Sequence, residues 1–128
     1  MYLDADVLLA ILKPTDWLKP YVKIELIDAP KTSALAVIEA EIVLAREYDR
    51  KNVLQVIDKI ESLKIEILEL DKETLKQSTI LLKKYPRLNI FDSVHAGFAA
   101  LKKEKVLSTD HIFDTIEGIE RVDPRNLK

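Results

Sequence analysis

Short apolar segments with strand character alternate along this chain with longer segments that carry the apolar spacing of helices. The segment Lys64 to Leu70 alternates polar and apolar residues with a period of two, which is typical of a strand with one exposed face. The other predicted strands are Tyr2-Leu3, Lys31 to Ala34, Val106 to Ser108 and Ile119 to Val122. Strands separated by helices predict an α/β fold with a mostly parallel central sheet flanked by helices.

The helical segments fill the intervals between these strands. We predict helices over 6–12, 36–49, 52–63, 72–84 and 90–103, a shorter helical piece within 15–28, and a tight turn or single helical turn over 109–115. Apolar residues occupy most of the circumference of the helix 36–49, so we expect that helix to be well buried. With 128 residues, 48% of them hydrophobic, the chain is expected to form one domain spanning 1–128.

The composition removes several kinds of active site. There is no Cys, which excludes disulfides, thiolate metal sites and cysteine nucleophiles, and two Gly residues are too few for a dinucleotide or phosphate-binding loop. No apolar run is long enough for a membrane span, and the N-terminus lacks the pattern of a signal peptide, so we expect a cytoplasmic protein with no membrane partner. The 22 carboxylates are the abundant reactive groups that remain.

Acidic residues stand at the points where strands end. Asp4 follows the first strand directly, and Asp110 follows the strand Val106 to Ser108. Asp92 lies in the first turn of the helix 90–103, and Glu39 lies near the start of the helix 36–49. Because sites in parallel sheets form at the carboxyl ends of the strands, these four acids are expected to converge.

Four converging carboxylates need compensation for their repulsion. Two carboxylates about 4 Å apart repel by roughly 1 kcal/mol in water and by several times more at a partly buried site. A cluster of oxygen ligands suits a hard divalent cation such as Mg²⁺ or Mn²⁺, which activates water and offsets charge on a phosphodiester. Helical geometry separates Glu39 from Glu41 by about 200°, so only one of the two faces the site.

Each acid also has a purely structural interpretation. Asp4 and Asp110 are candidates for N-caps, and Asp6 is placed to stabilise a helix N-terminus through the helix dipole. Asp114 is more typical of a salt-bridge or capping partner than of a metal ligand. His95 lies one turn after Asp92, either as a packed or surface histidine or as a hydrogen-bond donor behind the site.

Four blocks of the sequence together resemble the PIN-domain family, and specifically its VapC-type ribonuclease toxins. YLDADVLLAIL resembles the family's first strand, Asp and amphipathic helix, and TSALAVIEAEIVLA its second block, with a Ser six residues before the family Glu. FDSVHAGFAALKKE resembles the third block, in which an Asp opens an Ala-rich helix. VLSTDHIFDTIEGIERVDP resembles the closing block of strand, Thr, Asp and Phe. The blocks follow the family's order and span nearly the whole chain.

The resemblance implies roles for individual residues. Asp4, Glu39, Asp92 and Asp110 would form the acidic catalytic site, and Asp4 and Asp92 would be the principal Mg²⁺ ligands. Thr109 would support the site through its hydroxyl, and Ser33 would be the Ser of the second block. The implied activity is metal-dependent cleavage of RNA by an activated water, in a toxin that forms a homodimer and is inhibited by a cognate antitoxin protein.

Asp6 departs from the family pattern, because many members carry Asn there, and its extra charge bears on metal affinity. Other functions remain open at this point. The same fold would serve a housekeeping RNA-processing nuclease, or a non-catalytic module that binds RNA or protein. The spacing of Asp4 and Asp6 also fits the nucleophile motif of haloacid-dehalogenase-like phosphatases, although the chain is short for that family and Glu39 would have no role in it.

Overall fold

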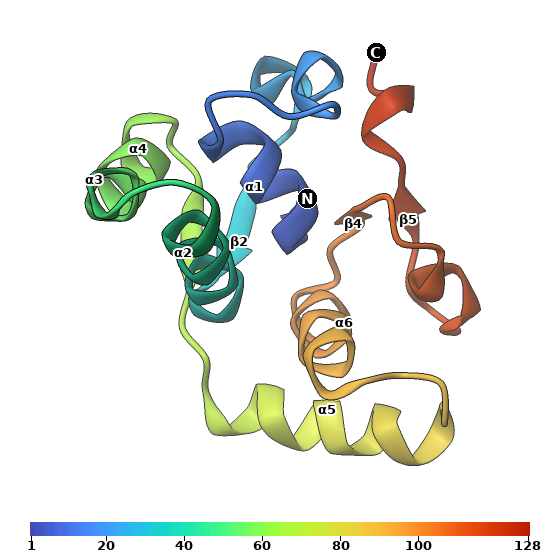
Figure 1. Cartoon of the computed structure of the whole chain (residues 1–128). Helices are drawn as coiled ribbons and strands as arrows, with labels where there is room; N and C mark the ends of the chain where they lie inside the picture. Colours follow the sequence, from blue (N-terminus) through green and yellow to red (C-terminus); the bar gives the residue numbers. More distant parts are fainter.

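The structure is a computed structural model that describes residues 1–128. Five strands alternate with helices along the chain (Figure 1). The strands are β1 (Tyr2–Leu3), β2 (Lys31–Ser33), β3 (Glu66–Leu68), β4 (Val106–Leu107) and β5 (Arg121–Val122). The α-helices are α1 (Ala5–Leu12), α2 (Ala34–Glu47), α3 (Arg50–Leu54), α4 (Val56–Ser62), α5 (Lys72–Lys84) and α6 (Ile90–Lys102). Short 3₁₀ helices are η1 (Lys19–Tyr21), η2 (Ile24–Leu26), η3 (His111–Thr115) and η4 (Pro124–Asn126).

All five strands pair in parallel, in the order β3-β2-β1-β4-β5. This confirms the predicted α/β class and the parallel sheet. The register pairs Leu3 of β1 with Leu107 of β4. The residues that follow these two, Asp4 and Ser108, therefore leave the sheet side by side at its carboxyl edge.

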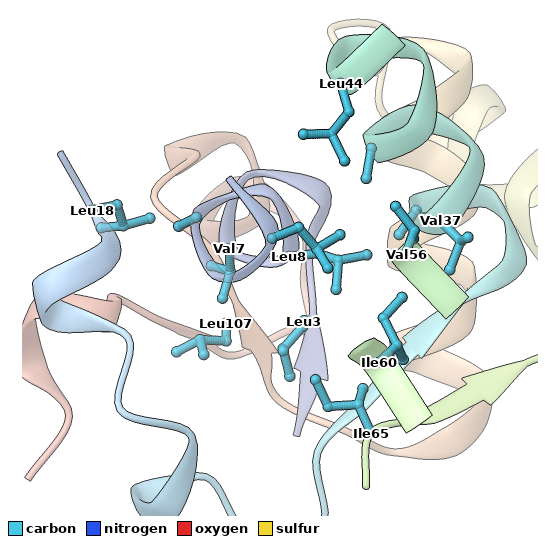
Figure 2. Close-up of a cluster of buried hydrophobic side chains, with 14 of the residues drawn as sticks. Leu3, Val7, Leu8, Leu18, Val37, Leu44, Val56, Ile60, Ile65 and Leu107 are labelled. Carbon is cyan, nitrogen blue, oxygen red and sulfur yellow. The ribbon is translucent and has the colours of Figure 1, made fainter. Parts of the chain in front are cut away.

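Alternating side chains of the central strands enter two separate hydrophobic clusters, as the two-residue period of a strand requires. Leu3 and Leu107 join the cluster formed with α1, α2 and α4, which Figure 2 shows. Tyr2 and Val106 join the second cluster, formed largely by α6 and the C-terminal half of α5. In Figure 1, α6 lies between α5 and the strands, so both faces of the sheet are covered.

Polar side chains fix where the longer helices begin. The side chains of Asp4, Ser33, Asp71 and Asn89 accept hydrogen bonds from backbone N–H groups in the first turns of α1, α2, α5 and α6. Such caps satisfy N–H groups that have no partner within the helix. The N-cap role expected for Asp4 is confirmed, and Asp4 combines it with a place at the sheet edge.

Three local expectations were wrong. The segment 15–28 forms the two 3₁₀ turns η1 and η2 instead of one helical piece, since Pro20 has no N–H with which to continue a helix. The predicted helix 52–63 is divided into α3 and α4 at Gln55, whose φ of −95° and ψ of −5° depart from helical geometry. α2 is not buried on all sides, because Ile38 and Ile42 are 54% and 51% exposed.

Candidate active site

Asp4 is held in a fixed orientation between two neighbouring strands. The Ala5 N–H donates to its Oδ1 at 2.9 Å, and the Ser108 hydroxyl donates to its Oδ2 at 2.8 Å. Ser108 occupies this place because of the register between β1 and β4. The residue predicted to support the site was Thr109, the neighbour of Ser108. The position of Ser108 directly after a strand adjacent to β1 is the feature that could have identified it.

Burial makes ionised Asp4 unfavourable. The residue is only 8% exposed, and burial raises the pKa of Asp4 to about 6. His95 opposes this shift and the charge of Asp6 adds to it, while the bonds from Ser108 and Ala5 lower the pKa. A buried carboxyl with a raised pKa is a common feature of functional sites, and a bound cation would favour its charged form.

His95 links Glu39 to the strand edge through a chain of buried hydrogen bonds. Its Nε2 atom lies 2.6 Å from Oε1 of Glu39 and 3.7 Å from Oδ1 of Asp4. Its Nδ1 atom lies 2.6 Å from the Tyr2 hydroxyl, which lies 2.7 Å from Oγ of Ser33. Since a carboxylate only accepts hydrogen bonds, the Nε2–H of His95 is the donor to Glu39.

The sequence pattern indicated no role for Tyr2, and it left His95 open as either a packed or surface residue or a hydrogen-bond donor behind the site. His95 is in fact both, at 1% exposure. Burial lowers the pKa of His95, but the hydrogen bond that His95 donates to Glu39 and the nearby carboxylates outweigh burial and leave that pKa raised. His95 follows Asp92 by three residues, and residues three apart share a helix face. This spacing could have indicated that His95 lies beside the acidic group.

Asp92 and Asp110 approach the site from α6 and η3. The Asp92 N–H donates to the Asn89 side chain at 2.8 Å, which fixes Asp92 in the first turn of α6. Burial raises the pKa of Asp92, and the charges of Asp110 and Glu39 raise it further, so these carboxylates lie within electrostatic reach of one another. Asp110 is exposed and caps η3 by accepting from the Ile112 N–H at 3.0 Å. Glu39 lies in the second turn of α2, later than expected.

The remaining predicted residues occupy supporting positions. Asp6 Oδ2 accepts hydrogen bonds from both the N–H (3.0 Å) and the hydroxyl (2.5 Å) of Thr109, so Asp6 anchors the segment after β4 rather than only stabilising the helix dipole. Ser33 caps α2 and bonds to Tyr2. Asp114 lies outside the acidic group, because its two carboxylate oxygens bond to Arg121 at 3.0 and 3.1 Å.

The donor set fits a hard divalent cation in its chemistry. Asp4, Asp92 and Asp110 contribute carboxylate oxygens, and none of them forms a salt bridge with a Lys or Arg. No group of three or more His, Asp or Glu side chains is gathered closely enough to hold a metal ion in this conformation. The carboxylates therefore share one edge of the sheet without forming a closed set of ligands.

The central strand of the parallel sheet ends in a buried Asp, and the adjoining helices carry further carboxylates. This chain is therefore an α/β protein with an acidic site at the carboxyl edge of its sheet. The sequence model of the PIN domain family matches residues 1–119, and the chain belongs to that family. This confirms the resemblance seen in the four sequence blocks. A comparison with curated proteins gives no match.

Several solved structures have a fold similar to that of this chain. VapC20 of Mycobacterium tuberculosis, described as a sarcin–ricin loop cleaving toxin, superposes with a TM-score of 0.77 at 12% identity, over 89% of this chain and 92% of VapC20. A toxin–antitoxin complex from Klebsiella pneumoniae gives 0.73 at 14% identity over 96% of each chain. FitAcB from Neisseria gonorrhoeae gives 0.69 at 19% identity, over 98% of this chain and 99% of that chain. No helix of this chain is both long and apolar enough to cross a bilayer.

Proposed function

We propose that this protein is a divalent-metal-dependent endoribonuclease and the toxin of a toxin–antitoxin pair. The observation that carries the proposal is the group of carboxylates at the carboxyl edge of the sheet, in which His95 is the only basic side chain near Asp4 and Glu39. Asp4 and Asp92 both have raised pKa values for which burial is the largest cause, and no Lys or Arg neutralises them. A bound Mg²⁺ or Mn²⁺ would supply that neutralisation, and such an ion activates water and stabilises charge on a phosphodiester.

In this proposal each acidic residue has a distinct task. Asp4 and Asp92 hold the cation, and the two hydrogen bonds from Ala5 and Ser108 keep Asp4 oriented toward it. Glu39 is oriented by the Nε2–H of His95. Asp110 is exposed at the rim, where it meets the incoming RNA and completes the acidic group. Preorganised groups of this kind contribute to catalysis because they need little rearrangement during the reaction.

The toxin role rests on the similar structures. VapC20 is described as a sarcin–ricin loop cleaving toxin, and the Klebsiella structure is described as a toxin–antitoxin complex. By analogy, the partners of this chain are an RNA substrate, a cognate antitoxin protein and a second copy of itself, in the cytoplasm. Membership of the PIN domain family removes the support for the phosphatase alternative, and Asp6 is bound to Thr109 rather than free to act as an acid or base.

The direct test is RNA cleavage by the purified protein with Mg²⁺ or Mn²⁺. Asp4→Asn should abolish cleavage and leave the fold intact, and Glu39→Gln should lower it strongly. Glu41→Gln is the matched control, because Glu41 lies on the same helix and bonds to none of the site residues. Equal cleavage by wild type and Asp4→Asn would overturn the assigned site. Expression of the wild type, but not of Asp4→Asn, should arrest growth; unimpaired growth with active wild type would favour a housekeeping nuclease.

A further inference from the structure

A hollow of about 190 Å³ lies directly beside the acidic edge and is lined by the exposed ring of Trp17. Asp6 and Thr109 form one wall of this hollow. Thr109 is the residue between Ser108 and Asp110, so the hollow adjoins the proposed catalytic group through the chain itself. A polynucleotide crossing the acidic edge would place a neighbouring nucleotide here.

Trp17 is an exposed aromatic side chain with a cation beside its ring. Its side chain is 64% exposed, and the guanidinium carbon of Arg125 lies 6.0 Å from the ring centroid. Arg125 is itself fixed by Asp123, which accepts from its Nε at 2.9 Å and from its Nη2. These bonds hold a planar cation next to the aromatic ring. Arginine planes and aromatic rings are the groups on which unpaired bases stack.

The charges in the hollow select a base rather than a phosphate. Asp6 and Asp16 both line it, and they would repel a phosphate. The one cation in the lining, Lys13, lies 2.8 Å from Glu47 and is already paired. The remaining surface comes from the ring of Trp17 and from Leu9 and Leu18, which suits a flat, uncharged group.

We propose that the Trp17 hollow is a stacking site for an unpaired nucleobase of the RNA, adjacent to the phosphodiester that is cleaved. The inference rests on the proposed nuclease function and assigns part of its substrate recognition. It predicts a preference for single-stranded segments or loops over duplex, because a base within a helix cannot reach the ring.

Trp17 is the only Trp in the chain, so the tryptophan fluorescence of the protein reports on this ring alone. The test is a titration of the whole protein in EDTA with a short single-stranded RNA oligonucleotide of mixed sequence, followed by tryptophan fluorescence. A saturable quench is expected. A matched oligonucleotide with abasic sites should quench little at the same concentrations, since it keeps the phosphates and lacks the bases.

Variants measure the contribution of the ring to RNA affinity; because replacing Trp17 removes the only Trp, their binding is followed by the fluorescence anisotropy of a dye-labelled RNA. Trp17→Ala should weaken RNA binding about 5- to 150-fold, the range for loss of one base–aromatic stack. Trp17→Phe should recover most of the affinity. Ile80→Ala is the control for a general surface effect, because it shortens an exposed apolar side chain on α5, outside the Trp17 hollow. Thermal unfolding of Trp17→Ala should match the wild type, because the ring is mostly exposed.

Three results would overturn the proposal. They are equal quenching by the abasic oligonucleotide, unchanged RNA affinity in Trp17→Ala, and a fluorescence change that follows protein concentration instead of RNA. The last would show that the ring lies in an interface between copies of the chain. Binding in EDTA is measured without cleavage. An inactive protein that still shows base-dependent quenching would therefore contradict the nuclease function and retain the stacking site.

Discussion

The Nε2 atom of His95 lies 2.6 Å from Oε1 of Glu39, although the two residues are 56 positions apart in the sequence. The pair joins α6 to α2 across the central strand. His95 is buried and Glu39 is partly exposed, so the histidine is the fixed member of the pair and the carboxylate is the member open to the proposed site. This contact gives His95 a positioning role that its sequence position alone did not define.

His95→Ala should lower the rate of RNA cleavage chiefly through kcat, because Glu39 loses the donor that orients it. The free energy of unfolding should fall by about 1–3 kcal/mol, since the Tyr2 hydroxyl also loses a buried partner. His95→Gln retains an N–H donor and should recover part of kcat. Kinetics and urea unfolding measure the two effects separately. Full kcat in His95→Ala would show that Glu39 needs no positioning partner.

Asp4→Asn should make the protein more stable near neutral pH while removing activity. The folded-state pKa of Asp4 is raised to about 6, so the folded state binds that proton more tightly than the unfolded state does. Stability therefore falls as pH rises from about 4 to 6, by up to about 3 kcal/mol for a shift of about two units. Asp4→Asn escapes this loss, and its advantage should disappear below about pH 4.

The measurement for Asp4 is urea unfolding of both proteins across that pH range, without divalent cations. Asp58→Asn, an exposed acid at the start of α4, is the control and should change stability by less than about 0.5 kcal/mol. A wild type that is as stable as Asp4→Asn at neutral pH would show that the ionised, buried Asp4 does not lower the stability of the folded state.

Divalent cations should raise the melting temperature of the wild type. An ion at 100 times its dissociation constant stabilises the folded state by about 2.7 kcal/mol. Asp4→Asn and Asp92→Asn should reduce this stabilisation, and lowering the pH through 6 should weaken it as Asp4 takes up a proton. Asp114→Asn should leave it unchanged, because the Asp114 carboxylate is bound to Arg121. Differential scanning fluorimetry with Mg²⁺ and Mn²⁺ measures the melting temperatures of the wild type and the three variants. A rise in Asp4→Asn equal to that of the wild type would exclude Asp4 as a ligand.

Replacements of Asp6 should separate its charge from its hydrogen bonds. Asp6→Asn keeps an acceptor for Thr109 and removes a charge that raises the pKa of Asp4, so cleavage should persist to lower pH than in the wild type. Asp6→Ala loses both bonds to Thr109 and should lower stability by about 1–3 kcal/mol. The pH–rate profile and urea unfolding are the measurements. Identical pH profiles of wild type and Asp6→Asn would mean that the Asp6 charge does not influence the site.

Much of this protein is already determined by local sequence. The alternation of strands and helices indicates the parallel sheet, since parallel neighbours must be joined by a long crossover connection, which is usually a helix. The caps at Asp71 and Asn89 are local as well, because a cap bonds to an N–H group only a few residues away. The acids at the strand ends follow from the same pattern.

Only the tertiary structure decided which polar groups meet. Ser108 contacts Asp4 because of a strand register, and Tyr2, His95 and Glu39 form a chain across three elements. Such contacts depend on how helices pack against the sheet, and no local spacing specifies them. The break at Gln55 and the exposed face of α2 have the same origin: apolar periodicity shows that a helix has an apolar side, but packing determines how much of that side is covered.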